Sequence, residues 1–126
     1  MTTVLIVEDD LSILRLFKIM LESEGFHTFE VNNGEKVVNM YKSLQEKPDI
    51  ILMDHRMPIK NGIEVLKEIL AIDNHSKIIL LSADTSIKNN VLSIGVIKFI
   101  KKPFSNNSLI KNIKTVLSLS ECANIV

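Results

Sequence analysis

Short, β-branched apolar runs alternate along this chain with longer segments whose apolar residues recur every three or four positions. Four of the runs are almost continuously apolar, which is typical of strands buried on both faces of a parallel sheet. The expected strands are residues 3–8, 26–31, 49–53, 77–82 and 96–101. The second strand alternates polar and apolar residues, so we expect it at an edge of the sheet.

The segments between the strands have the helical period. Helices are expected over 11–24, over 34–46, from about Gly62, over 85–94, and after an N-cap at Ser105. The fourth is the weakest, because Thr, Ser and Asn are mediocre helix formers. Right-handed crossovers then leave an α/β fold as the simplest closure, a doubly wound, five-stranded parallel sheet with helices on both faces.

Composition limits the functional classes. The 126 residues make one domain, 1–126, and 15 basic residues balance 15 acidic ones, so bulk attraction to nucleic acid or membrane is not expected. The apolar runs are far shorter than the roughly 18 residues of a membrane span, and the N-terminus has no basic segment typical of a signal peptide. The single cysteine, Cys122, excludes an internal disulfide and fits a reducing cytoplasm, where we expect the protein.

Side chains that can bind a metal ion or a phosphoryl group lie where four of the expected strands end. They are Glu8, Asp9 and Asp10 after the first strand, Asp54 after the third, Ser82 after the fourth and Lys102 after the fifth. Doubly wound sheets bind ligands at the carboxyl ends of their strands, so these side chains are expected to meet. Carboxylate oxygens suit Mg²⁺, which is usually held by one or two carboxylates with phosphate and water. The sequence therefore predicts a site for a divalent cation and a phosphoryl group.

Each of these residues also has an ordinary structural explanation. Asp10 directly precedes the first helix, and we expect it to be the N-cap of that helix rather than a metal ligand. Asp54 alone could start a turn into Met57-Pro58, Ser82 could cap the fourth helix, and Lys102 could be a solvated lysine. These explanations must all hold independently, which makes their conjunction improbable.

Four motifs resemble the signature of response-regulator receiver domains. They are Val7-Glu8-Asp9-Asp10, Met53-Asp54-His55-Arg56-Met57-Pro58 with Gly62, Leu81-Ser82-Ala83, and Lys101-Lys102-Pro103-Phe104. The resemblance spans essentially the whole chain and implies a flavodoxin-like sheet of strand order 2-1-3-4-5, as in chemotaxis regulators. It implies a phospho-acceptor switch of a two-component system. Such a switch is not an enzyme in the usual sense, because it catalyses only its own phosphorylation and dephosphorylation.

The resemblance also implies a role for each acidic residue. Asp54 accepts a phosphoryl group from a histidine kinase or a phosphotransfer protein and becomes an acyl phosphate. Glu8 and Asp9 hold Mg²⁺ together with Asp54, and the backbone carbonyl of Arg56 completes the protein ligands.

Three further residues would bind and report the phosphoryl group. Lys102 neutralises its oxygens and Ser82 donates a hydrogen bond to one of them. Phe99 matches an aromatic residue that changes rotamer when the hydroxyl residue moves. Serine stands here where threonine is also common, and phenylalanine where tyrosine is frequent. The Lys102–Pro103 peptide is expected to be cis.

Two other functional classes fit less well. A Mg²⁺-dependent phosphohydrolase with an aspartate nucleophile usually has a second acid two residues later, where this chain has Arg56. A flavodoxin-like nucleotide-binding module needs an anion cradle rich in Gly, Ser or Thr after the first strand, where Glu8, Asp9 and Asp10 would repel phosphate in the absence of a cation. Arg56 is instead expected to face Asp84 across the mouth of the site.

The output surface is expected on the face made by the fourth helix, the fifth strand and the fifth helix. That face would display Lys88, Lys98, Lys111 and Lys114. These lysines favour an acidic partner protein, or an acidic patch on a second copy in a homodimer. The alternative is that they are ordinary solvated lysines. No direct contact of this domain with nucleic acid or membrane is expected.

Overall fold

The computed structural model describes residues 2–57 and 60–125, with side chains up to Ser118. Pro58 of the second motif and the side chain of Cys122 lie outside this description. The elements, in chain order, are β1 (Thr3–Val7), α1 (Leu11–Ser23), β2 (His27–Val31), the 3₁₀ turn η1 (Gly34–Lys36), α2 (Val37–Ser43), β3 (Ile50–Asp54), α3 (Gly62–Ile72), β4 (Ile78–Ser82), the 3₁₀ turn η2 (Thr85–Ile87), α4 (Lys88–Ile94), β5 (Lys98–Lys101) and α5 (Asn106–Ile125).

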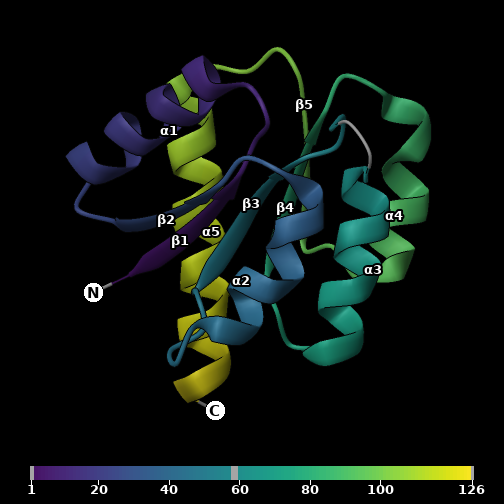
Figure 1. The fold of residues 1–126 in the computed structure, drawn as a ribbon. Helices are drawn as coiled ribbons and strands as arrows, with labels where there is room; N and C mark the ends of the chain where they lie inside the picture. The colour runs from purple at the N-terminus through teal and green to yellow at the C-terminus, as the bar shows by residue number, and fades with distance from the viewer. Residues whose placement is uncertain (1, 58–59, 126) are drawn as a thin grey trace.

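The strands form one parallel sheet in the order β2-β1-β3-β4-β5 (Figure 1). This confirms the doubly wound, flavodoxin-like α/β fold and places β2 at an edge. Every residue of β3 and β4 is buried, which explains their continuous apolar sequence. Of the helices in the described part of the chain, none has the length and apolar character that crossing a membrane requires.

Alternate residues of the strands feed two cores. In Figure 1, α1 and α5 lie on one face of the sheet and α2, α3 and α4 on the other. Leu5, Ile51 and Leu80 pack with α2, α3 and α4. Ile6 and Leu52, which point to the opposite face, pack with α1 and α5. The sheet therefore separates two apolar layers and carries the site residues at its carboxyl edge.

The second helix is shorter than expected. The predicted segment 34–46 consists of the 3₁₀ turn η1 followed by seven residues of α-helix. The backbone of Leu44 is already extended. The Lys47 ammonium group donates hydrogen bonds to the carbonyls of Tyr41 and Leu44, at 2.5 and 2.9 Å. The Tyr41 carbonyl otherwise accepts only a long hydrogen bond, at 3.4 Å from the Leu44 N–H, so the lysine adds a second donor there and caps the last turn of α2.

The fourth helix is also short. The predicted segment 85–94 begins as the 3₁₀ turn η2, which Asp84 caps by accepting a hydrogen bond from the Ser86 N–H. Gly95, with φ 132°, ends α4, and the N–H groups of Gly95 and Val96 both donate to the Val91 carbonyl at 3.1 Å. Val96 therefore belongs to the helix end, and β5 begins two residues later than predicted.

Candidate functional site

Backbone hydrogen bonds join the ends of β3, β4 and β5. The His55 N–H donates to the Leu81 carbonyl at 3.0 Å, and the Lys102 N–H donates to the Ser82 carbonyl at 2.9 Å. The peptide bond between Lys102 and Pro103 is cis, as predicted. The residues that follow Asp54 and the residues at the ends of β4 and β5 thus share one frame of main-chain atoms.

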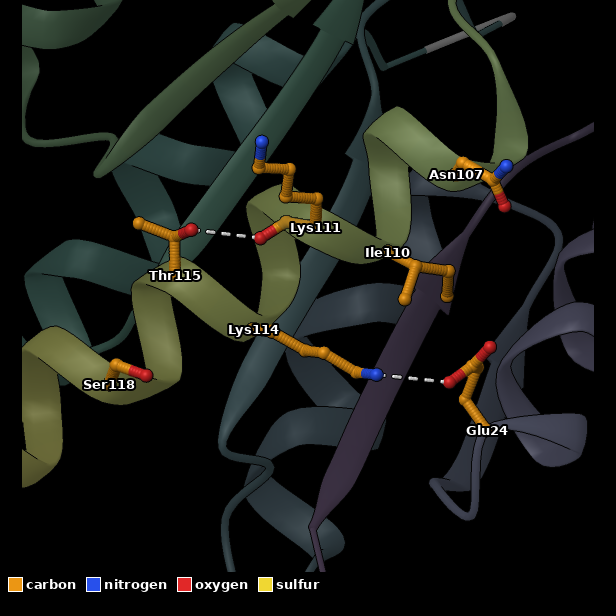
Figure 2. A pocket seen from close by; sticks show the side chains of 7 residues that line it. All are labelled: Glu24, Asn107, Ile110, Lys111, Lys114, Thr115 and Ser118. Carbon is orange, nitrogen blue, oxygen red and sulfur yellow. Dashed lines mark hydrogen bonds and ion pairs between the residues drawn. The ribbon is translucent and has the colours of Figure 1, made fainter.

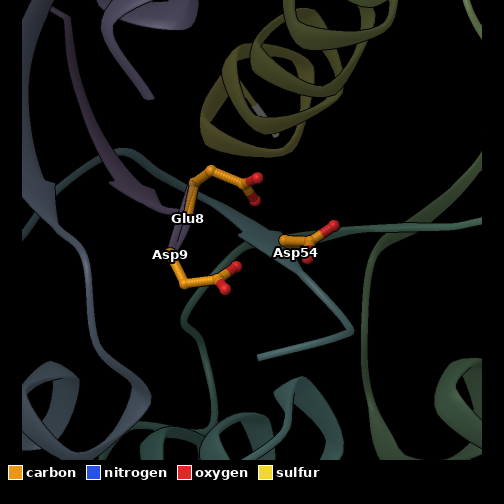
Figure 3. A group of neighbouring side chains, drawn as sticks. All are labelled: Glu8, Asp9 and Asp54. Atoms are coloured by element: carbon orange, nitrogen blue, oxygen red, sulfur yellow. The ribbon is translucent and has the colours of Figure 1, made fainter. Parts of the chain in front are cut away.

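Three carboxylates gather at this edge. Glu8 and Asp9 reach from the end of β1 toward Asp54 at the end of β3 (Figure 3), and one oxygen from each lies within 4.8 Å of the others. Asp10 does not join them. It caps α1 by accepting hydrogen bonds from the N–H groups of Ser12 and Ile13, so its expected role as an N-cap is confirmed.

Glu8 is the acidic residue in the least favourable surroundings. Its side chain is 3 % exposed, and its Oε2 atom has no hydrogen-bond partner among the described residues. Burial, and then the negative charge of Asp54, raise the pKa of Glu8 to about 7, although Lys102 acts in the opposite direction. A buried carboxyl group without a partner needs a proton or a cation, and clustered carboxylate oxygens suit a hard divalent ion.

Lys102 supplies positive charge to the centre of the cluster. Its ammonium group contacts Oδ1 of Asp54, a side chain that is itself buried. The structure therefore brings the expected acceptor carboxylate and the expected phosphate-binding lysine into direct contact. An aspartate oxygen held beside an ammonium group is arranged for a reaction in which negative charge accumulates on a transferred group.

A cavity of about 530 Å³ opens beside this pair. It is lined by Asp54, Arg56, Ser82, Ala83, Asp84 and Lys102. Arg56 and Asp84 thus both border the cavity, as expected, but no ion pair between them is found in the described residues. Hydrogen bonds from Ser86 hold the pKa of Asp84 below its usual range, and the charge of Arg56 lowers it further. The position of the Arg56 carbonyl relative to the carboxylates stays a prediction.

Ser82 is buried and bonded away from Asp54. Its Oγ accepts a hydrogen bond from the Asp84 N–H at 3.0 Å and lies 3.3 Å from Nδ1 of His55. Burial lowers the pKa of His55, which favours the neutral ring. His55 was not among the residues expected to act. The register Asp54↔Leu81 places it opposite Ser82, whereas aligning the last residues of the two strands would have paired Ser82 with Asp54, so the sequence carries no signal for this contact.

Phe99 is buried on β5, opposite Leu80, and packs with the core that includes α2, α3 and α4. It therefore has its inward position in this structure. Its expected change of rotamer stays a prediction.

The lysines of the expected output face are not equivalent. Lys88, Lys98 and Lys111 are exposed. Lys114 instead pairs with Glu24, the residue after α1, at 3.1 Å (Figure 2). In Figure 2 Lys114 reaches toward Glu24, whereas the Lys111 side chain points away from it. The positive charge of Lys114 is therefore directed toward α1 and partly neutralised, whereas it was expected to be displayed with the other three lysines on the face of α4, β5 and α5.

Comparison with known proteins agrees with this arrangement. The model of the response regulator receiver domain family matches residues 4–114. The chemotaxis protein CheY of Thermotoga maritima is 36% identical over 116 residues, covering 90% of this chain and 95% of CheY. The transcriptional regulatory protein CpxR of Klebsiella pneumoniae is 34% identical over 122 residues, which cover 95% of this chain but 51% of CpxR. The chain thus spans about half the length of that relative.

A solved structure extends the comparison to three dimensions. The response regulator TrrA of Thermotoga maritima, in complex with Mg²⁺ and BeF, has a TM-score of 0.83 at 29% identity. The match covers 92% of this chain and 99% of TrrA. With the family match running through all four strand ends of the site, the chain belongs to the response-regulator receiver domains of two-component and chemotaxis signalling.

Proposed function

We propose that this domain is a phospho-acceptor switch in which Asp54 takes a phosphoryl group from a histidine kinase or a phosphotransfer protein. The observation that carries the proposal is the buried Asp54 carboxylate, which contacts the Lys102 ammonium group and lies beside Glu8 and Asp9. Three carboxylates this close repel one another, so the arrangement does not serve stability alone.

In the proposed reaction an oxygen of Asp54 attacks the phosphorus of the donor phosphohistidine. The P–O bond of an acyl phosphate forms, the P–N bond breaks, and the imidazole leaves with the electron pair of that bond. Lys102, already in contact with Asp54, neutralises charge on the phosphoryl oxygens. Ser82 then donates a hydrogen bond to one of these oxygens. The chain acts on no other substrate and catalyses only the gain and loss of its own phosphoryl group.

Glu8, Asp9 and Asp54 would hold Mg²⁺, together with the backbone carbonyl of Arg56. The unpartnered oxygen of buried Glu8 supports this, since a cation would satisfy it. The complex of TrrA with Mg²⁺ and BeF supports it for a related domain. When bound, the ion neutralises charge on the acceptor and on the transferred group.

The proposed output surface is the face of α4, β5 and α5, from which Lys88, Lys98 and Lys111 project. Phe99 lies in β5 at this face, and β5 is hydrogen-bonded to Ser82 through Lys102. A shift of Ser82 toward the phosphoryl group would therefore act on β5 directly. We expect the partner to be an acidic surface of another protein or of a second copy of this chain.

The proposed function is tested by incubating the domain with acetyl phosphate and Mg²⁺ and measuring the intact mass. One adduct of about 80 Da is expected, the mass of a phosphoryl group. It should be absent in Asp54→Asn and when EDTA removes the metal. Asp10→Asn is the matched control, because asparagine preserves the cap of α1 and leaves the cluster intact. An adduct of unchanged yield in Asp54→Asn would disprove the assignment.

A further inference from the structure

The hydroxyl of Ser82 has two partners, and neither is in the acidic cluster. Its Oγ lies 3.0 Å from the Asp84 nitrogen and 3.3 Å from His55 Nδ1. In the described part of the chain these are its hydrogen bonds. His55 is not among the residues that line the cavity beside Asp54, whereas Ser82 is. The hydroxyl is therefore bonded to a ring outside the space that a phosphoryl group would enter.

Counting protons favours the Ser82 hydroxyl as the donor and His55 Nδ1 as the acceptor in this contact. A backbone N–H can only donate, so the Ser82 oxygen is the acceptor toward Asp84. The hydroxyl has one proton of its own, and Ser82 is only 2 % exposed, so leaving that proton without an acceptor would be unfavourable. In a neutral ring with its proton on Nε2, Nδ1 of His55 is an acceptor within reach.

We infer that His55 is a positioning residue that holds the Ser82 hydroxyl in the resting state and opposes its movement toward a phosphoryl group on Asp54. The inference rests on the proposed function of Asp54. Ser82 has one proton to donate, so it cannot donate to His55 and to a phosphoryl oxygen at the same time. Loss of the His55 acceptor therefore favours the phosphoryl-bound arrangement.

The backbone of His55 is fixed well enough for this role. Its N–H donates to Leu81 at 3.0 Å, and its carbonyl accepts from the Gly62 N–H at 2.8 Å. A Cβ atom on Gly62 would lie 3.0 Å from the His55 Cα, so α3 packs directly against this residue. Because the main chain is held from β4 and from α3, the imidazole reaches Ser82 from a fixed point.

The test measures the affinity of the domain for beryllofluoride, an analogue of the phosphoryl group. Beryllofluoride is titrated into the domain in the presence of Mg²⁺, at a pH where histidine is neutral. His55→Phe keeps a flat ring without an acceptor and should bind beryllofluoride about three- to tenfold more tightly, the worth of one net hydrogen bond. His55→Asn offers an acceptor near the position of Nδ1 and should restore binding toward that of the unsubstituted domain. His75→Phe, at an exposed site after α3, is the control and should change nothing.

A double-mutant cycle separates positioning from a merely structural effect. In a Ser82→Ala background, His55→Phe should leave the beryllofluoride affinity unchanged, because the hydroxyl through which His55 acts is gone. The same gain in both backgrounds, or none with Ser82 present, would overturn the inference while leaving the proposed function standing. Failure of the unsubstituted domain to bind beryllofluoride would instead remove the proposed function and this inference with it.

The resting contact can be measured without metal or analogue. In ¹⁵N spectra of the imidazole at the same pH, Nε2 should be protonated and Nδ1 unprotonated, as the acceptor role requires. A ring protonated on Nδ1 would overturn the inference independently of any binding result.

Discussion

Glu8 makes the stability of the metal-free domain depend on pH. Its pKa lies at about 7 in the folded chain against 4.5 for an ordinary glutamate, so the folded chain binds the extra proton between these values. Stability therefore falls as pH rises through this window, and by about pH 8 the loss is nearly complete, roughly 3 kcal/mol. Glu8→Gln should remove this part of the pH dependence.

The measurement is urea unfolding in EDTA at about pH 5 and about pH 8, at the two ends of that window. Glu8→Gln should be clearly more stable than the unsubstituted domain at the higher pH and similar to it at the lower one. Glu46→Gln, at an exposed position after α2, is the control and should leave the pH dependence unchanged. Equal stabilisation by Glu8→Gln at both pH values would contradict the assigned pKa.

Asp9 contributes repulsion to the same cluster, since its charge raises the pKa of Glu8. Asp9→Asn should therefore leave the metal-free domain as stable as before, or up to about 1 kcal/mol more stable. On the proposed function it should also remove the rise in melting temperature that Mg²⁺ gives the unsubstituted domain. A lower melting temperature of Asp9→Asn in EDTA would show that the carboxylate stabilises the fold, contrary to this account.

Among the helices, α4 has the fewest anchors. Its only buried residue is Val91, it has no side-chain N-cap of its own, and asparagines fill positions 89 and 90. Amide exchange at residues 88–94 should therefore be faster than in α1 or α3. Asn89→Ala should slow this exchange and add about 0.5 kcal/mol of stability. Asn39→Ala, the same change in α2, should leave exchange in α4 unaltered.

The early end of α2 depends on a side chain distant from the site. Lys47→Met removes the donor to the Tyr41 and Leu44 carbonyls and the contact of the ammonium group with the Tyr41 ring, 4.9 Å from its centroid. A loss of about 1 kcal/mol in the free energy of unfolding is expected. Lys42→Met removes a lysine that lies within α2 itself and serves as the control. An equal loss in both variants would mean that general charge, not capping, matters.

At the scale of the whole molecule, the sheet joins two cores into one cooperative unit. Tyr41 is the only tyrosine, the chain has no tryptophan, and this ring lies in the core of α2, α3 and α4. Leu52→Ala empties space in the opposite core and should cost about 2–5 kcal/mol. Tyr41 fluorescence and far-UV circular dichroism should still report the same urea midpoint. A later midpoint by fluorescence would show that the cores unfold separately.

The sequence predicted those features that depend on hydrophobic periodicity and on the residues at the ends of strands. The strands, the cap at Asp10 and the meeting of Glu8, Asp9 and Asp54 follow from rules that act along a segment or along one edge of a sheet, whereas the strand order came from the family resemblance. The sequence could not predict which residues of β3 and β4 point to which face of the sheet. Both faces are apolar there, so the hydrophobic period gives no information.

Contacts between side chains of different elements were beyond sequence reasoning. The Lys114–Glu24 pair joins residues far apart in the chain, and its formation depends on how α5 lies beside α1. The approach of His55 to Ser82 depends on a strand register that becomes visible only when the sheet is assembled. The capping of the Tyr41 and Leu44 carbonyls by Lys47 likewise depends on how the loop after α2 folds back.

The main-chain bonds that join residue 55 to 81 and residue 102 to 82 use no side-chain atom. Substitutions at 55, 56 or 84 can therefore alter the chemistry around Asp54 while the frame that carries it persists. On the proposed function, the duration of a signal becomes a trait that single mutations can lengthen or shorten without rebuilding the protein. Descendants of such a gene can diverge in timing, from brief responses to lasting ones, while they inherit the same architecture.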